Sequence, residues 1–272
     1  MPPSAERTSY HVEFNLPSFD DNIFLVWGYG SILWKQEFEY VAEYESYIKG
    51  YKRVFYQGSK DHRGTVEKPG RVVTLLPTED KEARVYGKAY QLPADPEKLK
   101  KIFTALDVRE DGYDRVQLTL YNAHPTTGNC TTPVTCRPSA KAFQPEARDV
   151  HACTNSTDWE VGDVEVELDI FTHPNAPAMQ RRKNVMYLVY IATEKNADYM
   201  GDAPMEVMAR EILGRTGISG PNREYLFFLA DCLRAIGAVD SHVFELDATA
   251  KRLLRDHEQE YISGAKRLVT IA

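Results

Sequence analysis

The chain has 272 residues and a formal net charge of −7, from 33 basic and 40 acidic side chains. Because 43% of its residues are hydrophobic and 11% aromatic, it can bury a packed core, and global disorder is not expected. The acidic balance and the lack of a basic block in the sequence argue against nucleic acid as a partner. Without a secretory signal at the N-terminus or an apolar run near the roughly 18 residues that span a bilayer, we expect a cytoplasmic protein that does not enter a membrane.

Composition divides the chain into three parts. Residues 1–20 are polar, and we expect a flexible N-terminal arm followed by a single domain over residues 21–272. Residues 123 to about 183 hold six of the 15 prolines and three of the four cysteines. A stretch of this length without regular structure is unusual in a compact domain, so we predict an insertion there.

Six segments have the composition of β-strands, rich in Val, Ile, Tyr, Phe and Thr and bounded by turn residues. They are residues 23–29, 47–58, 71–77, 83–92, 113–121 and 185–193. The first, IFLVWGY, is a continuous apolar run, which favours a central strand buried on both faces.

Helices are predicted mainly in the second half of the chain. The earliest should begin after a cap at Asp95 with Pro96 in its first turn, bury one apolar face and end near Gly112. That face is formed by Leu99, Ile102, Phe103 and Leu106. Three more helices are expected over residues 203–215, 222–237 and 241–259. Strands first and helices last indicate an α+β fold, with a small sheet or barrel and its helices gathered at one side.

The turn after the first strand reads WGYGSILWK, residues 27–35. It matches neither the G-x-G-x-x-G dinucleotide fingerprint nor the G-x-S-x-G nucleophile elbow. One interpretation is a tight turn that needs a positive φ at Gly28 or Gly30. The other is a loop whose backbone N–H groups face a ligand, as in anion-binding nests and oxyanion holes.

A second cluster, LDVREDGY, places Glu110 and other charged residues at the expected end of a helix. A solvated charged terminus is one interpretation. Acids at a helix C-terminus face the negative end of the dipole, however, and burial there would raise the pKa of a glutamate.

Metal binding is the weaker hypothesis. Three cysteines and one histidine lie within the predicted insertion, but they contain no C-x-x-C pair, and their spacing fits no familiar zinc site. These residues are Cys130, Cys136, His151 and Cys153.

Together, these segments resemble the ChaC-like γ-glutamylcyclotransferases, which act on glutathione. The similar blocks are residues 27–35, 50–75, 106–113, 190–204 and 219–234. The resemblance implies an α+β fold with a small mixed β-barrel and flanking helices, and a lyase that forms 5-oxoproline without a cofactor. It implies that the single domain of residues 21–272 is a catalytic domain of this type.

The resemblance also implies roles for particular residues. Glu110 would be the catalytic acid and base. A cradle for the γ-glutamyl group would be formed by Tyr29, Gly30, Ser31 and Ile32, and Tyr225 would help to hold the substrate. The chain departs from the family pattern after the glutamate: Asp111 and Gly112 stand where a lysine and two glycines are usual.

Three other hypotheses stay open at this point. A cyclotransferase could act on other γ-glutamyl amino acids or amines, and a protein of the same fold could bind a partner without catalysis. A serine hydrolase would use Ser31 as its nucleophile, although the sequence shows no His/Asp pattern to support one.

Overall fold

The computed structural model describes residues 22–110, 113–116, 118, 120–123 and 184–271. The expected N-terminal arm, nearly all of the predicted insertion and its cysteines and histidine lie outside these residues. Within the described part of the chain, no group of three or more His, Cys, Asp or Glu side chains could hold a metal ion.

The elements follow one another with strands first and helices last, as the sequence predicts for an α+β fold. The strands are β1 (Asn22–Gly28), β2 (Ala42–Lys49), β3 (Tyr51–Ser59), β4 (Gly70–Pro77), β5 (Arg84–Gln91), β6 (Asp114–Val116), β7 (Tyr121–Asn122), β8 (Asn184–Ile191), β9 (Thr216–Gly217) and β10 (Gly220–Pro221). The helices are the 3₁₀ turn η2 (Ser31–Leu33), α1 (Pro96–Arg109), α2 (Met205–Gly214), α3 (Asn222–Ala235) and α4 (Ser241–Ile271).

Six strands form a mixed sheet in the order β6-β8-β1-β5-β2-β7, and β3 pairs with β4 in a separate ribbon. β1 runs parallel to β8 and antiparallel to β5, so the apolar run of the sequence is a central strand, as predicted. Its side chains alternate between two cores. Leu25 and Trp27 join the cluster covered by α2, α3 and α4, whereas Phe24 and Val26 pack with α1.

Two of the six predicted strands are each divided in the structure. The segment 47–58 is broken at Gly50, whose φ of +75° suits glycine, and its halves belong to β2 and β3. The segment 113–121 becomes β6 and β7 at opposite edges of the six-stranded sheet.

This second division requires the sheet to curve. Five residue steps from Val116 to Tyr121 can cover at most about 18 Å. Six strands laid flat would separate the edges by about 24 Å. The sheet is therefore curved, and the described strands do not close into a ring of hydrogen bonds, so the predicted barrel is not confirmed.

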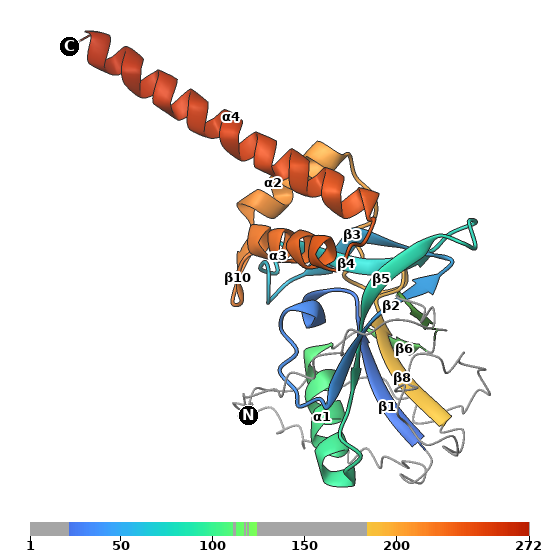
Figure 1. Ribbon diagram of the computed structural model, residues 1–272. Coiled ribbons are helices and arrows are strands. Elements are labelled where there is room, and N and C mark those ends of the chain that lie inside the picture. The colour runs from blue at the N-terminus through green and yellow to red at the C-terminus, as the bar shows by residue number, and fades with distance from the viewer. Residues whose placement is uncertain (1–21, 111–112, 117, 119, 124–183, 272) are drawn as a thin grey trace, which may run out of the picture.

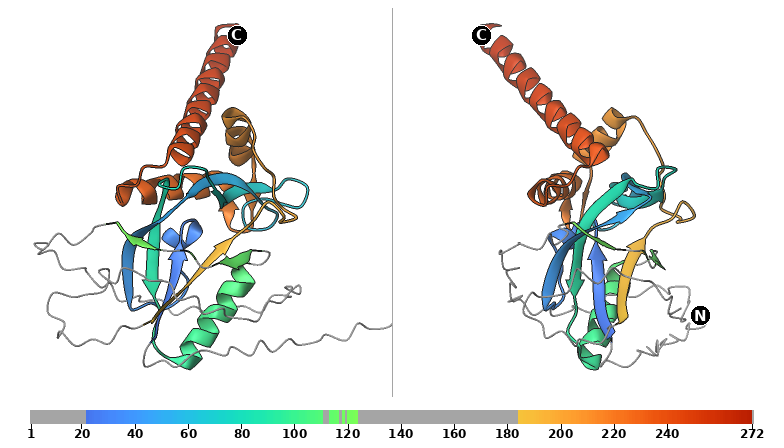
Figure 2. Two further views of the ribbon diagram at one scale, coloured as in Figure 1. Left: turned by 90° about the vertical axis from the view of Figure 1, so that its right-hand side faces the viewer. Right: turned by 45° about the vertical axis from the view of Figure 1, so that its right-hand side comes forward.

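Helices lie at both ends of the molecule (Figures 1 and 2). α2, α3 and α4 gather over the β3–β4 ribbon, and α1 lies beside β1 at the other end of the sheet. α4 is longer than the predicted 241–259, and its C-terminal part extends away from the body of the protein. No helix in the described part of the chain is both long enough and apolar enough to cross a membrane.

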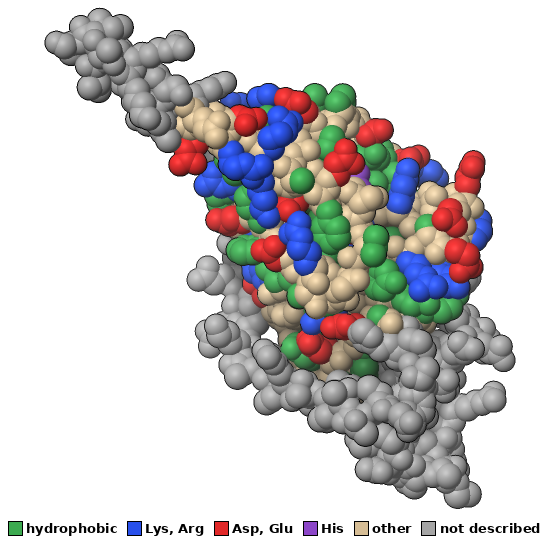
Figure 3. Space-filling view, turned by 45° about the horizontal axis from the view of Figure 1, so that its top comes forward, with side chains coloured by type: hydrophobic (Ala, Val, Ile, Leu, Met, Phe, Trp, Pro, Cys, Tyr) green, Lys and Arg blue, Asp and Glu red, His purple; other side chains and the backbone are tan. Residues whose placement is uncertain are grey.

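Basic and acidic side chains are interspersed on the face formed by the C-terminal helices (Figure 3). Arg252 on α4, for example, lies 3.6 Å from Glu206 on α2 and 3.3 Å from Asp256 on its own helix. Such exposed pairs contribute little to stability.

A β-bulge in the ribbon connects it to the helices. Phe55 and Tyr56 on β3 oppose the single residue Val73 on β4. The N–H of Phe55 donates to Nε2 of His242 in the first turn of α4, at 3.0 Å. Burial lowers the pKa of His242, because the protonated ring loses its solvation there, and the neutral ring is the form that accepts this bond.

The histidine at the bulge predicts that the free energy of unfolding depends on pH. A histidine with a lowered pKa adds stability above its unfolded pKa of about 6.5, and this is lost as pH falls toward the folded pKa. His242→Gln retains an acceptor for Phe55 but does not titrate. We expect thermal unfolding of the wild type to lose stability below pH 6.5, by about 1 kcal/mol or more, and the variant to show a shallower dependence. Equal pH dependence in both proteins would contradict this assignment.

Candidate active site

Glu110 occupies the end of α1, as the sequence predicts. The helix begins at Pro96, the carboxylate of Asp95 caps it by accepting the N–H of Lys98 at 3.0 Å, and its four predicted apolar residues are buried. It ends at Arg109, and Glu110 is its C-cap residue, with an N–H that donates to Leu106 O at 2.8 Å. Packing of the apolar face on β1 therefore fixes the position of the glutamate.

The Glu110 side chain is largely withdrawn from solvent, with 16% of its surface exposed. Burial raises its pKa above the ordinary value of 4.5, and the charge of Arg109 partly opposes this shift. A carboxyl group of this kind takes up and releases protons closer to neutral pH than a solvated glutamate does. The solvated terminus considered as an alternative is thus wrong for Glu110.

The loop after β1 lies beside this helix end. Nη2 of Arg109 donates to Oγ of Ser31 at 2.7 Å, and Nε of the same guanidinium is 3.3 Å from Oε1 of Glu110. Ser31 begins the single 3₁₀ turn η2, whose first N–H groups have no acceptor within the turn itself. The structure therefore brings the predicted loop and the predicted acid together through one arginine.

Gly30 is required for a close approach and not for its φ. Its φ is −125°, and among the described residues neither it nor Gly28 belongs to the glycines with positive φ, so the tight-turn interpretation is wrong. A Cβ on Gly30 would lie 2.8 Å from Oη of Tyr225 and 3.1 Å from Cγ2 of Val73. The missing side chain lets the loop backbone reach the α3 tyrosine.

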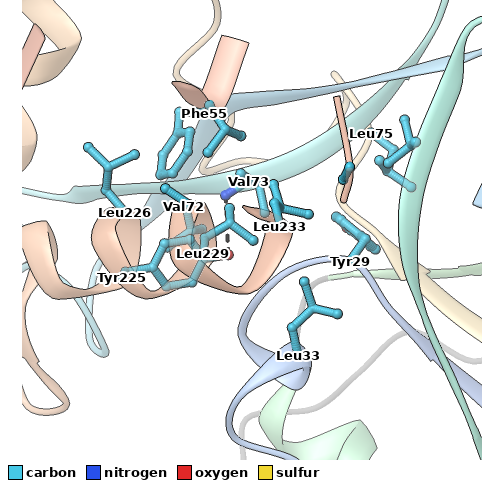
Figure 4. Close-up of a cluster of buried hydrophobic side chains, with 14 of the residues drawn as sticks. Tyr29, Leu33, Phe55, Val72, Val73, Leu75, Tyr225, Leu226, Leu229 and Leu233 are labelled. Atoms are coloured by element: carbon cyan, nitrogen blue, oxygen red, sulfur yellow. Dashed lines mark hydrogen bonds between the residues drawn. The ribbon is translucent and has the colours of Figure 1, made fainter. Parts of the chain in front are cut away.

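Tyr225 and Asn222 lie one turn apart on α3, and both bond to the backbone of β4. Asn222 is fully buried and pairs with the backbone of Arg71 on β4, accepting its N–H at 2.7 Å and donating to its carbonyl at 2.8 Å. One turn further along α3, Oη of Tyr225 accepts the N–H of Val73 at 3.4 Å (Figure 4). The ring packs edge-on against Trp34 and Phe55, with centroid distances of 5.2 and 5.9 Å.

Tyr29 and Ile32 are buried to the same extent as Tyr225. Tyr29 stacks on Trp27, and its hydroxyl donates to the carbonyl of Tyr190 at 2.8 Å. Ile32 is buried in the cluster with α1, so its side chain is part of the core and only its backbone is available to a ligand. Of the five predicted binding residues, Ser31 contacts the arginine beside Glu110 directly, and Gly30 approaches Tyr225.

The electrostatics connect the same residues. Burial raises the pKa of Tyr29 and of Tyr225, and the charge of Glu110 adds to both shifts. Tyr113, three residues after Glu110, is partly buried. Desolvation raises its pKa, and the charges of Tyr29 and Glu110 add to the shift. The four groups therefore lie within electrostatic range of one another.

Two residues of this site have no assigned role at the sequence level. Tyr113 ends the LDVREDGY cluster, and Arg109 precedes the glutamate within it. Their positions next to a candidate acid were visible, but a charged or aromatic residue at a helix end is usually solvated or packed. Only the tertiary contacts distinguish a residue of the site from one that is merely solvated or packed.

The chain is similar to known proteins over most of its length. The ChaC-like protein family matches residues 24–253 of the chain. "Gamma-glutamylcyclotransferase 2-3" of Arabidopsis thaliana is 31% identical over 86% of this chain and 92% of its own length. The human "Glutathione-specific gamma-glutamylcyclotransferase 1" is 31% identical over 89% and 85%, and the Schizosaccharomyces pombe "Glutathione-specific gamma-glutamylcyclotransferase" is 30% identical over 85% and 93%.

The fold has a counterpart among solved structures. The yeast γ-glutamylcyclotransferase specific to glutathione superposes with a TM-score of 0.59, at 24% identity, over 85% of this chain and 96% of that chain. This likeness concerns the fold. The profile match over most of the chain, together with relatives at 30–31% identity, shows that the chain belongs to the ChaC-like protein family.

Proposed function

We propose that the protein degrades glutathione by intramolecular cyclisation, releasing 5-oxoproline and Cys-Gly. The observation that carries this function is the buried Glu110 beside the Gly30–Ser31 loop, in a chain whose relatives bear the names of γ-glutamylcyclotransferases. The catalytic domain would comprise residues 21–272, with its curved sheet as part of the small mixed β-barrel that the family resemblance implies.

The reaction joins two parts of one substrate molecule. The α-amine nitrogen of the γ-glutamyl group attacks its own side-chain amide carbonyl, and the bond from that carbon to the cysteine nitrogen breaks. Holding the two groups in contact is the main task, since oriented intramolecular reactions reach effective molarities of about 10⁵–10⁸ M.

Glu110 would move the proton. An α-amine has a pKa near 8 and is largely protonated at neutral pH, so it needs a base before it can attack. Glu110 would accept this proton and pass one to the departing nitrogen of Cys-Gly, a contribution of about 10²–10⁴-fold. Its raised pKa suits both steps better than the pKa of a solvated glutamate.

The loop would hold the acyl oxygen. Negative charge grows on the amide oxygen during attack, and the backbone N–H groups at Gly30, Ser31 and Ile32 are the proposed donors. The close approach of Gly30 to Tyr225 would shape this cradle, with Tyr225 holding the γ-glutamyl group.

The direct test is product analysis. We expect incubation with glutathione to yield 5-oxoproline and Cys-Gly in equal amounts, measured by mass spectrometry, with γ-Glu-Ala as a parallel substrate. In H₂¹⁸O the 5-oxoproline should gain no label, because cyclisation consumes no water. Labelled glutamate would indicate a hydrolase instead, and no product from either substrate would indicate a binding protein.

The hydrolase hypothesis is already weakened by the contacts of Ser31. Its hydroxyl oxygen accepts a hydrogen bond from the Arg109 guanidinium. A guanidinium has no acceptor and is not deprotonated in proteins, so it cannot activate a serine nucleophile.

Tyr225→Phe tests the binding role of the α3 tyrosine. The variant keeps the ring that packs against Trp34 and Phe55 but loses the hydroxyl that lies beside Gly30 and accepts from Val73. We expect kcat/KM for glutathione to fall about 3- to 10-fold, the range of one neutral hydrogen bond. Steady-state kinetics identical to wild type would reduce Tyr225 to a packing residue.

A further inference from the structure

We propose that Arg109 is a positioning residue for this reaction, which holds the Ser31 hydroxyl and the Glu110 carboxylate in one fixed arrangement. The inference rests on the proposed function, because it concerns how the same site is kept ready for the reaction. It is carried by the contacts of a single guanidinium at the junction of the loop and α1.

The guanidinium uses all three of its nitrogens. Nη2 donates to Ser31 Oγ at 2.7 Å, and Nε is 3.3 Å from Oε1 of Glu110. Nη1 donates to the backbone carbonyls of Lys35 at 2.6 Å and Gln36 at 3.3 Å. The side chain is 16% exposed, so these contacts are shielded from competing water.

The segment after the 3₁₀ turn bends around the guanidinium. Glu37 has a φ of +56°, the one positive φ of a non-glycine residue in the described part of the chain. Its carboxylate lies 3.6 Å from Nη1 of Arg109. A non-glycine residue in the left-handed region is uncommon and is held by its surroundings, which here include this ion pair and the two carbonyl contacts beside it.

Arg109 determines the direction in which the Ser31 hydroxyl can donate. A guanidinium has donors only, so Ser31 Oγ must be the acceptor in their bond. The hydroxyl hydrogen is then free of Arg109 and can donate to a ligand oxygen. The arginine thus converts Ser31 into an oriented donor on the loop.

Arg109 also determines which carboxylate oxygen of Glu110 takes part in proton transfer. The Nε of Arg109 pairs with Oε1 of Glu110. The other carboxylate oxygen, Oε2, is then the one that accepts and releases the proton. The positive charge lowers the pKa of Glu110, against the larger effect of burial. Other ionisable groups act within the same electrostatic network, from several elements: Tyr29, Arg53, Asp61, Arg63, Tyr113 and Tyr225.

Lysine cannot replace this residue. Its single ammonium nitrogen cannot reach the serine hydroxyl, the two carbonyls and the carboxylate together, whereas the planar fork of arginine can. Arg109→Lys therefore keeps the positive charge but loses the simultaneous contacts with Ser31, Glu110 and the two carbonyls. Arg109→Gln loses both the charge and these contacts. Arg210→Gln is the matched control, because Arg210 is exposed and pairs only along α2 with Glu206, at 2.7 Å, among the contacts described.

The experiment measures kcat and KM for glutathione against pH in the full-length chain. We expect both Arg109 variants to lose about 10²-fold in kcat, the cost of a misplaced catalytic group, with little change in KM. Arg109→Gln should also move the acidic limb of the profile to higher pH, while Arg109→Lys leaves it near the wild-type position. Arg210→Gln should match wild type throughout.

Two results would overturn the proposal: wild-type kcat in Arg109→Lys, or an unmoved acidic limb in Arg109→Gln. The carboxyl ¹³C NMR titration of Glu110, assigned by its loss in Glu110→Gln, gives a readout that needs no turnover. An upward shift in Arg109→Gln supports the proposal and an unchanged titration contradicts it. If wild-type protein released no 5-oxoproline, the proposed function would fail, and the NMR titration would still decide the role of Arg109.

Discussion

Glu110→Gln is expected to reduce kcat for glutathione by about 10²–10⁴-fold while the protein stays folded. Glutamine keeps the size and most of the hydrogen bonding of the side chain but cannot accept the amine proton. KM should change little, because the loss falls on proton transfer. Glu97→Gln is the matched control, since Glu97 is exposed in the first turn of the same helix. Release of 5-oxoproline by Glu110→Gln at the wild-type rate would exclude Glu110 as the base.

The same substitution should stabilise the fold at neutral pH. The folded pKa of Glu110 is raised, so its stabilising contribution is present below the unfolded pKa and is lost as pH rises through the folded pKa. Glutamine cannot ionise, so the variant avoids the cost of burying the charged form, which grows as pH rises. We expect a higher Tm for Glu110→Gln at pH 7 and a difference that shrinks as pH falls toward 4.

A gain in stability together with a loss of activity would mark Glu110 as a functional residue. Replacing a residue that serves only packing lowers both stability and activity. If Tm instead drops at pH 7, the interaction with Arg109 outweighs burial, and the proposed direction of the Glu110 pKa is wrong.

Local patterns were sufficient to predict α1 and the start of the site. Asp95 and Pro96 mark the start of the helix, and its four apolar residues have the spacing that places them on one face. Helical periodicity and capping depend on neighbouring residues, so they are visible in a sequence. The position of Glu110 at the end of that helix follows directly.

The strand assignments were less complete, because alternation does not reveal pairing. Residues 113–121 alternate as one strand would, yet β6 pairs with β8 and β7 with β2, at opposite edges of the sheet. Nothing in the local pattern distinguishes a single strand from two short edge strands joined across a curved sheet. The prediction for α4 ended at residue 259, whereas the helix continues to Ile271 and its distal part extends away from the body of the protein.

The roles of glycine and arginine in the site are tertiary properties. Gly30 was expected to serve a turn or a ligand, but its contact is with Tyr225, 195 residues later in the chain. Arg109 was one charge among several at a helix end. Its bond to Ser31 spans 78 residues and appears only when α1 packs beside the loop.

Gly30→Ala is expected to lower kcat/KM for glutathione by about 10²-fold without unfolding the protein. Its Cβ would lie 2.8 Å from Tyr225 Oη, so either the loop or the tyrosine must move. Tyr225 has little room, because Trp34 and Phe55 pack against its ring and Val73 bonds to its hydroxyl. Movement therefore falls on the loop that carries the proposed N–H donors. Gly214→Ala is the control, since a Cβ there meets nothing within 4 Å.

The double variant Gly30→Ala with Tyr225→Phe separates this steric cause from a general loss of loop flexibility. Phenylalanine lacks the hydroxyl oxygen that the new methyl group would strike, so the loop can return toward its native position. We expect the two effects on kcat/KM to be non-additive, with the double variant more active than Gly30→Ala alone. A double variant that loses the sum of both effects would show that the contact between Gly30 and Tyr225 does not shape the site, because residues that do not interact contribute independently.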